Sequence, residues 1–122
     1  MILVVDDNPV QALTRKAILN RAGLEVRTVY SAEAAFDALD SDENRDINLV
    51  ITDHIMPGES GCHFVERLWE RRAGLSVMVL SGLPEAEADY KALDITFRAK
   101  PIPPSELVAL ATKLSKNAPA KL

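Results

Sequence analysis

The sequence predicts an α/β domain in which a parallel sheet of five strands is covered by helices on both faces. Five short apolar runs alternate along the chain with five segments of helical character, as in β-α-β units joined by right-handed crossovers. The run over residues 47–51, broken only by Asn48, is typical of a strand buried on both faces. A chain of 122 residues is long enough for one domain with its own core.

The N-terminal part of the chain predicts two strands and two helices. Residues 2–5 form the first strand, and Pro9 suits the first turn of the helix that follows. Ala22-Gly23 ends this helix, whose apolar residues recur at helical spacing as Val10, Leu13, Ala17 and Ile18. Residues 24–30 alternate enough to form a strand near a sheet edge, and Ser31 suits the N-cap of the next helix. One face of that helix carries Ala32, Ala35, Phe36 and Leu39.

The C-terminal part continues the alternation after the strand over 47–51, where Pro57-Gly58 turns the chain. The remaining strands are expected at 75–80 and 95–99, and the remaining helices at 60–72, at 84–93 and after Pro103-Pro104. The final helix has an apolar stripe made by Leu107, Leu110, Ala111 and Leu114. We therefore expect one domain over residues 1–115, followed by a flexible tail or linker stub over residues 116–122.

Polar side chains follow four of the five predicted strands. The first strand ends in Asp6 and Asp7, the third in Asp53, the fourth in Ser81 and the fifth in Lys100. An Asp before a Pro-Gly pair usually only caps a turn, but four strands ending in such groups are not explained by capping. Because ligands of parallel α/β sheets bind at the carboxyl ends of the strands, these residues are expected to form one site.

The predicted site has a definite chemistry. Three carboxylates in one cleft repel one another, so Asp6, Asp7 and Asp53 must share a proton or a divalent cation. Oxygen ligands with open positions suit Mg²⁺, with Mn²⁺ as the alternative. A carboxylate beside such an ion is a competent nucleophile toward phosphorus and forms an acyl phosphate. Lys100 would neutralise charge in this transfer, and the Ser81 hydroxyl could hold a phosphoryl oxygen.

The residues around these strand ends form four motifs, Val4-Val5-Asp6-Asp7-Asn8, residues 52–58 (TDHIMPG) with Gly61 following, Leu80-Ser81-Gly82 and residues 97–101 (FRAKP). In this order and spacing they resemble the response-regulator receiver domain, and the resemblance covers residues 2 to about 115. It implies a flavodoxin-like fold, a doubly wound five-stranded sheet of strand order 2-1-3-4-5 with five helices.

The resemblance also implies roles for individual residues. Asp53 would be the phosphoacceptor. Asp6 and Asp7 would hold Mg²⁺, directly or through water, together with Asp53 and the backbone carbonyl of Ile55. Lys100 would be the cation that pairs with the phosphoryl group, and its bond to Pro101 would be cis.

The implied function is signalling. A sensor histidine kinase or a histidine phosphotransfer protein would donate its phosphoryl group to Asp53. The new charge would draw in the switch hydroxyl of Ser81, and the switch aromatic Phe97 would rotate into the space left behind. The change would reach the face made by the helix over 84–93, the strand over 95–99 and the final helix.

That face is expected to bind a downstream output domain or protein, or a second copy of the chain. It carries Glu85, Glu87, Asp89, Lys91 and Arg98, which could equally form an ordinary solvated surface. The chain would not be an enzyme acting on other substrates, since it would catalyse only its own phosphorylation and dephosphorylation. Self-dephosphorylation is expected to be slow, because Ile55 and Leu83 flank the attacking water in this family and neither can bind it.

Composition excludes several other classes of protein. A net charge of −4, with no basic stripe, argues against direct nucleic-acid binding. No apolar run approaches a membrane span, no signal peptide opens the chain, and one cysteine cannot form an internal disulfide. These features predict a cytoplasmic protein without membrane insertion. A chain that begins at its first strand also favours a domain taken from a longer regulator.

Two other functions compete with the phosphoacceptor. A degenerate receiver would act only as a protein-interaction module, but such domains usually lack one of the key residues that this chain keeps. A phosphatase with an aspartyl nucleophile would carry a second Asp two residues after the first, where this chain has Asn8. Neither His54 nor His63 is expected to act as a phosphohistidine, and Cys62 is expected to be a passive thiol.

Overall fold

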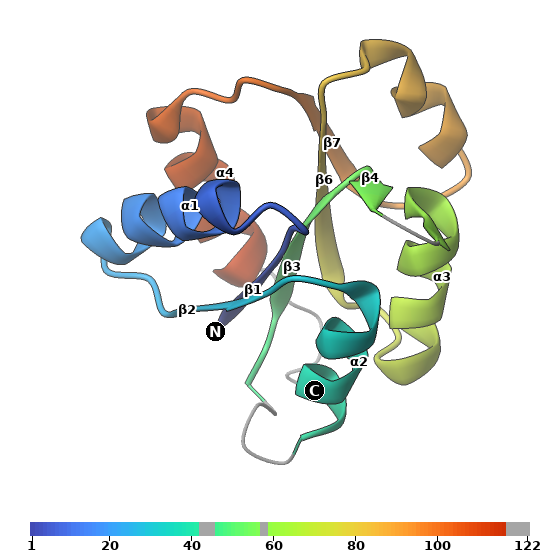
Figure 1. Cartoon of the computed structure of the whole chain (residues 1–122), viewed down its shortest axis with the longest axis horizontal. Helices are drawn as coiled ribbons and strands as arrows, with labels where there is room; N and C mark the ends of the chain where they lie inside the picture. The colour runs from blue at the N-terminus through green and yellow to red at the C-terminus, as the bar shows by residue number, and fades with distance from the viewer. Residues whose placement is uncertain (42–45, 57–58, 117–122) are drawn as a thin grey trace.

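The structure is a computed structural model that describes residues 1–41, 46–56 and 59–116. Its centre is a parallel sheet of five strands in the order β2-β1-β3-β6-β7 (Figure 1). The strands are β1 (Ile2–Val5), β2 (Val26–Val29), β3 (Leu49–Asp53), β6 (Ser76–Ser81) and β7 (Thr96–Ala99). Counted along the chain, this is the predicted order 2-1-3-4-5, with the second strand at an edge. The predicted fold class is confirmed.

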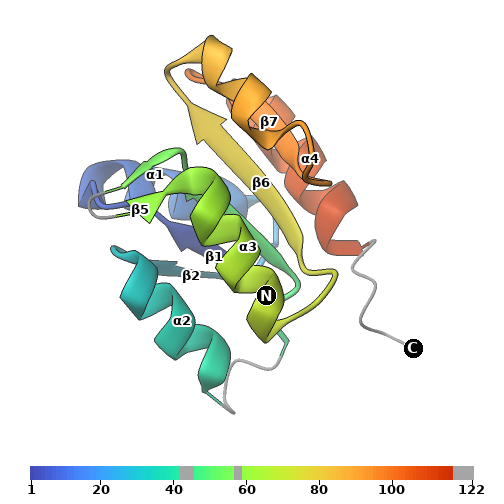
Figure 2. The same cartoon turned by 90° about the vertical axis from the view of Figure 1, so that its right-hand side faces the viewer.

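Helices cover both faces of the sheet (Figures 1 and 2). They are α1 (Pro9–Arg21), α2 (Ala32–Asp40), α3 (Gly61–Arg71), α4 (Pro104–Lys116) and the 3₁₀ helix η2 (Pro84–Tyr90). One core cluster joins α1 and α4 to the sheet, and the other joins α2, α3 and η2 to the opposite face. The sheet is therefore the middle of three layers, as the sequence predicts.

The three central strands, β1, β3 and β6, are buried on both faces, which is why they are apolar with little alternation. In β1, Ile2 and Val4 pack toward α1 and α4, whereas Leu3 and Val5 pack toward α2 and α3. All four are at most 1% exposed. Burying an aliphatic side chain of this size stabilises the folded state by about 1.5–3 kcal/mol. The three central strands are therefore firmly held, and so are the residues at their carboxyl ends.

Local signals set the helix ends. The side chain of Asn8 caps α1 by accepting hydrogen bonds from the backbone N–H groups of Val10 and Gln11, at 3.0 and 3.2 Å. At the other end of α1, Gly23 has a φ of +87°, a conformation that favours glycine. Ser31 caps α2 as predicted, through a 3.1 Å hydrogen bond from the N–H of Ala34.

Helix α1 buries a different face from the one that its most apolar residues mark. Val10 and Leu13 are 74% and 50% exposed, whereas Ala12, Arg15 and Leu19 are buried. The apolar residues that recur at helical spacing therefore do not form the buried stripe, although Ile18 packs partly buried against the core. The buried stripe contains an arginine because Arg15 has a buried partner at the end of β1.

Two other segments differ from the prediction. Residues 84–93 were expected to form one helix, but the structure has a 3₁₀ helix that ends at Tyr90. Its first turn is closed by a 2.9 Å hydrogen bond from the N–H of Ala86 to the carbonyl of Leu83, the tight i to i+3 pattern. After Asp53, the short strands β4 (Ile55–Met56) and β5 (Glu59–Ser60) pair antiparallel. The predicted turn at Pro57-Gly58 between them lies outside the described residues.

At its C-terminal end the description stops with α4. The predicted tail over 116–122 therefore lies outside the described residues, except for Lys116, the last residue of α4. Across the described part of the chain, no helix combines the length and the apolarity needed to span a membrane.

Candidate functional site

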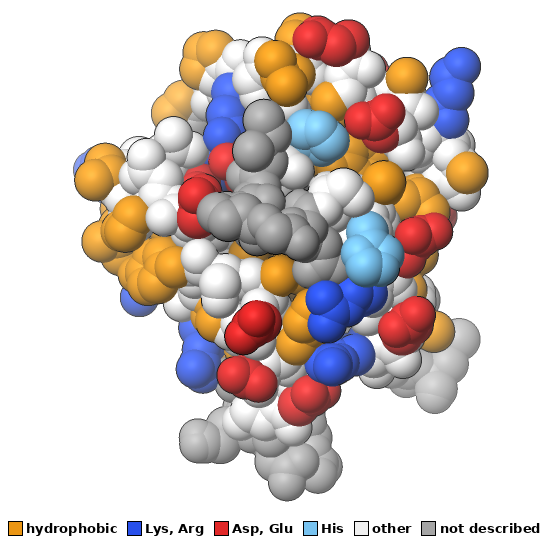
Figure 3. Space-filling model, turned by 45° about the vertical axis from the view of Figure 1, so that its right-hand side comes forward, with side chains coloured by type: hydrophobic (Ala, Val, Ile, Leu, Met, Phe, Trp, Pro, Cys, Tyr) orange, Lys and Arg blue, Asp and Glu red, His pale blue; other side chains and the backbone are white. Residues whose placement is uncertain are grey.

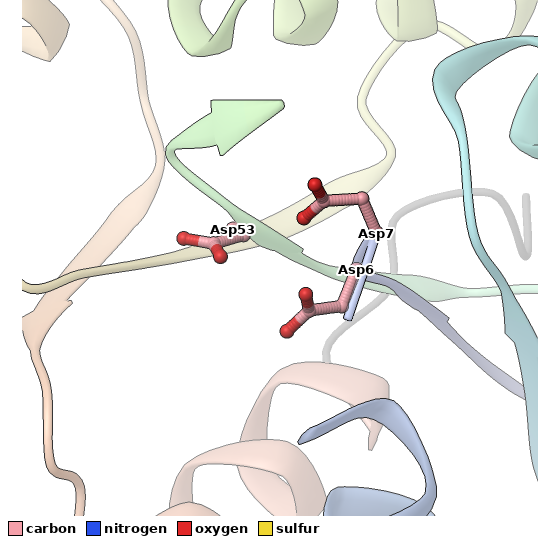
Figure 4. A group of neighbouring side chains, drawn as sticks. All are labelled: Asp6, Asp7 and Asp53. Atoms are coloured by element: carbon pink, nitrogen blue, oxygen red, sulfur yellow. The ribbon is translucent and has the colours of Figure 1, made fainter. Parts of the chain in front are cut away.

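Three carboxylates meet at the carboxyl ends of two neighbouring strands (Figure 4). Asp6 and Asp7 follow β1, and Asp53 ends β3, which pairs with β1 in register. One carboxylate oxygen from each lies within 4.8 Å of the others. Asp6 is fully buried, Asp53 is partly buried and Asp7 is exposed. The sequence predicted this cluster correctly.

Lys100 reaches the cluster from the end of β7. Its Nζ donates to Oδ2 of Asp53 at 2.9 Å, and the two side chains are 23% and 13% exposed. The backbone N–H of Lys100 also donates to the carbonyl of Ser81 at 2.7 Å. This hydrogen bond fixes the start of the loop between β7 and α4. The Lys100–Pro101 peptide bond is cis, as the resemblance implies. A partly desolvated ion pair of this kind is held more firmly than a surface pair.

Ser81 lies at the same edge but its hydroxyl is engaged elsewhere. The residue is 1% exposed at the end of β6. Its Oγ accepts a hydrogen bond from the N–H of Leu83 at 2.9 Å and lies 3.4 Å from the carbonyl oxygen of the same residue. The hydroxyl thus closes the turn that leads into η2, and Leu83 itself is exposed.

Two functional candidates were missed from the sequence, and both lie on α1. Nη1 of Arg15 donates to Oδ2 of Asp6 at 2.6 Å, and this ion pair is buried. Oε1 of Gln11 accepts from Nζ of Lys100 at 3.2 Å and lies 3.4 Å from Nη2 of Arg15. The available signal was the spacing of Arg15, which falls on one helix face with Ala12 and Leu19.

The residue after the predicted nucleophile also has a buried partner. Nδ1 of His54 and the hydroxyl of Tyr90 share a hydrogen bond of 2.6 Å, and their rings meet edge to face with centroids 5.5 Å apart. Tyr90, only 3% exposed, also packs against Phe97, with ring centroids 5.8 Å apart. Phe97 is itself buried and belongs to the core cluster on the α2, α3 and η2 face of the sheet.

Burial raises the pKa of Tyr90 well above its ordinary value, and the nearby sulfur of Cys62 and the carboxylates of Asp89 and Asp53 add to the effect. The Tyr90 phenol therefore stays protonated and able to hydrogen-bond throughout the neutral range.

Three other residues were singled out from the sequence, namely His63, Cys62 and Ile55. Both histidine side chains are on the face shown in Figure 3. His63 is exposed on α3, and Cys62 beside it is partly buried, with Sγ 3.7 Å from Oγ of Ser60. Ile55 begins β4, the strand directly beyond the site, and its predicted carbonyl contact with a metal stays a prediction.

The donor set fits a small hard cation. Asp6, Asp7 and Asp53 offer only oxygen, and they carry three formal negative charges against two positive charges on Arg15 and Lys100. Oxygen-only ligands with one exposed member match the preference of Mg²⁺, which retains several water molecules.

The fold and the strand-end residues together define the class of this protein. The chain matches the model of the response regulator receiver domain over residues 2–112, with Asp6, Asp7, Asp53, Ser81 and Lys100 inside the match. The chain belongs to the response regulator receiver family.

Relatives and solved structures agree with this assignment. The chain is 30% identical over 122 residues to the DNA-binding transcriptional regulator NtrC of Azospirillum brasilense, covering 97% of this chain and 25% of that protein. It is 28% identical over 118 residues to the two-component response regulator ORR6 of Oryza sativa subsp. japonica, covering 93% and 69%. A response regulator receiver protein from Pseudomonas putida superposes with a TM-score of 0.82 at 32% identity, covering 92% of this chain and 94% of that one. The chain thus spans only part of these two curated relatives.

Proposed function

We propose that Asp53 accepts a phosphoryl group from the phosphohistidine of a sensor histidine kinase or a histidine phosphotransfer protein, in a reaction that requires Mg²⁺. The observation that carries this proposal is the pairing of Asp53 with Lys100 at 2.9 Å, directly beside Asp6 and Asp7. A nucleophile, a cation for the phosphoryl group and a set of metal ligands then lie within one cleft.

The chemistry follows from these positions. A carboxylate oxygen of Asp53 attacks phosphorus, the phosphorus–nitrogen bond of the donor breaks, and the released imidazole nitrogen takes a proton from solvent. The product is an acyl phosphate on Asp53. Asp6 and Asp7 would hold Mg²⁺, which supplies charge neutralisation on the phosphoryl oxygens when bound. Lys100 already pairs with the carboxylate of Asp53, so it could pair with the negatively charged phosphoryl group once that group is attached.

The proposed readout begins at Ser81. A phosphoryl oxygen on Asp53 would accept a hydrogen bond from the Ser81 hydroxyl and so compete with the carbonyl oxygen of Leu83, which lies 3.4 Å from Oγ. The same hydroxyl accepts the N–H of Leu83 and closes the turn into η2. Because η2 carries Tyr90, a shift of this turn acts on the ring pair that Tyr90 forms with Phe97. Phe97 is already buried in this structure. Phosphorylation would therefore hold the ring of Phe97 where it is, instead of rotating it inward.

The surface that would sense this change is the face made by η2, β7 and α4. It contains a groove of about 330 Å³, lined in part by Glu87, Lys91, Phe97 and Leu110. Glu85, Glu87, Asp89 and Lys91 on this face are exposed, and Arg98 forms an ion pair with Glu106 at 3.1 Å. We propose this face for an output domain, an output protein or a second copy of the chain.

The chain would catalyse only its own phosphorylation and a slow loss of the phosphoryl group. Hydrolysis needs a water molecule directed at phosphorus, and the apolar side chains at positions 55 and 83 cannot orient one by hydrogen bonding. The signal would therefore persist until a partner removes it.

Intact-mass spectrometry with acetyl phosphate and Mg²⁺ tests the proposal. The expected result is one phosphoryl adduct on the wild type that is absent from Asp53→Asn and from a sample without Mg²⁺. The same result is expected with a phosphorylated histidine phosphotransfer protein as donor. Lack of an adduct with both donors, in a protein shown to bind Mg²⁺, would overturn the proposal in favour of a protein-interaction module.

A further inference from the structure

The buried side chain of Arg15 pairs with Asp6, the most deeply buried of the three carboxylates at the proposed metal site. Arg15 is 8% exposed, Asp6 is 0% exposed, and Nη1 of Arg15 lies 2.6 Å from Oδ2 of Asp6. The other carboxylate oxygen, Oδ1, accepts the backbone N–H of Asn8 at 2.9 Å. Both oxygens of Asp6 therefore already have donors, and one of these donors is a full positive charge.

Arg15 is held in this place by the rest of the site. Its Nη2 lies 3.4 Å from Oε1 of Gln11, and the same oxygen accepts from Nζ of Lys100 at 3.2 Å. One neutral amide thus lies between two cations, each of which pairs with its own carboxylate. The arrangement resists a swing of Arg15 toward solvent, because leaving would break contacts to both Asp6 and Gln11.

We infer that Arg15 acts as a built-in counter-cation of the acidic cluster and lowers the affinity of Asp6 for Mg²⁺. This inference rests on the proposed metal site. A divalent ion that approaches the three carboxylates must either share Asp6 with the guanidinium or displace it. Both routes weaken binding, since like charges repel and the desolvated Arg15–Asp6 contact would be lost.

The same pair has an opposite effect on the metal-free protein. With Arg15 in place, the buried charge of Asp6 is compensated, so the cleft is stable without a bound ion. Without Arg15, Asp6 would be a buried, uncompensated carboxylate, and a bound cation would restore the balance. The stability of an Arg15 variant should therefore depend on Mg²⁺ more strongly than the stability of the wild type.

The test compares Mg²⁺ binding to the wild type and to Arg15→Met. Binding is measured by NMR, from the shifts of backbone amides near the acidic cluster as Mg²⁺ is added. The dissociation constant is expected to fall about tenfold in R15M, as for removal of one unit charge a few ångströms from a divalent ion in a water-like dielectric. The increase in melting temperature at saturating Mg²⁺ should also be larger in R15M than in the wild type.

Two further variants separate the local charge from other effects. Arg15→Lys keeps a positive charge, and its dissociation constant should lie closer to the wild type than to R15M. Arg21→Met removes the same charge from an exposed position at the end of the same helix, and should leave the dissociation constant unchanged. If R15M does not fold, the comparison of Arg15→Lys with Arg15→Gln gives the same contrast.

An unchanged or higher dissociation constant in R15M would overturn the inference, because Arg15 would then only support the fold or orient Asp6 for the metal. That outcome leaves the proposed function intact if the wild type binds Mg²⁺ and gains a phosphoryl adduct. If neither protein binds Mg²⁺, the metal part of the proposed function and this inference both fail.

Discussion

The hydroxyl of Tyr90 lies 2.6 Å from Nδ1 of His54, the residue that directly follows Asp53. This hydrogen bond joins the β3 side of the site to η2, and Tyr90 continues the connection to the ring of Phe97. The contact depends on Gly61 at the start of α3. A Cβ added there would overlap the Tyr90 hydroxyl and would lie 3.1 Å from Nδ1 of His54.

The first prediction is that Gly61→Ala destabilises the protein by about 1–3 kcal/mol, the usual effect of an added methyl group in a packed site. The free energy of unfolding by urea measures this. Gly82→Ala is the matched control, because a Cβ at Gly82 meets nothing within 4 Å. The double variant Gly61→Ala/Tyr90→Phe should recover part of the loss, since it removes the hydroxyl that the new methyl group meets. Equal losses for the two glycine variants would contradict this reading of Gly61.

The second prediction concerns alkaline pH and Tyr90. Because burial raises the pKa of this phenol in the folded protein, the folded state keeps a proton that the unfolded chain loses above about pH 10. The folded state then binds more protons than the unfolded state, so the unfolding free energy falls as pH rises through this region. In Tyr90→Phe this part of the fall, up to about 1.4 kcal/mol per pH unit, should be absent.

Urea unfolding between about pH 8 and about pH 11 measures the difference. Tyr30→Phe is the control, because Tyr30 directly follows the edge strand β2 and is 43% exposed. This variant should keep the slope of the wild type. Parallel curves for the wild type and Tyr90→Phe would show that Tyr90 does not carry the alkaline dependence.

The parts of this molecule that the sequence predicts are those that follow from strand topology alone. Parallel strands bring their carboxyl ends to one edge, so Asp6, Asp53 and Lys100 could be placed together from their positions after apolar runs. The buried face of α1 could not be predicted, because it contains Arg15. The buried ion pair of Arg15 with Asp6 outweighs the apolar periodicity of the helix. The 3₁₀ form of η2 was not predicted either, because the spacing of Ala86 and Tyr90 in the sequence does not distinguish it from an α-helix.

The third prediction is that Lys100→Met lowers the rate of phosphoryl uptake by Asp53 about a hundredfold, the usual loss when one preorganised electrostatic contact is removed. The reason is that Lys100 is the cation bound to Asp53, at 2.9 Å. The rate is measured by intact mass with acetyl phosphate at fixed Mg²⁺. Lys113→Met, which removes an exposed lysine from α4, should keep the rate of the wild type. A rate in Lys100→Met equal to that of this control would rule out the assigned role.

The last prediction concerns the lifetime of the acyl phosphate. Its hydrolysis requires water to attack phosphorus, after which the bond to the Asp53 oxygen breaks and phosphate leaves. By the family resemblance, position 55 flanks this water, and Ile55 cannot bind it. Ile55→Asn supplies an amide that can orient the water, and one hydrogen bond of about 1.4 kcal/mol in the transition state would speed decay about tenfold.

The decay is followed by intact mass after removal of the phosphodonor. Leu13→Asn provides the matched control, since it makes the same chemical change at a half-exposed position of α1 and should leave the lifetime unchanged. A lifetime in Ile55→Asn no shorter than in the control would mean that access of water to phosphorus, rather than its orientation, limits the decay. The slow decay would then be assigned to the charges of the acidic cluster, where Lys100 pairs with Asp53 and Arg15 pairs with Asp6.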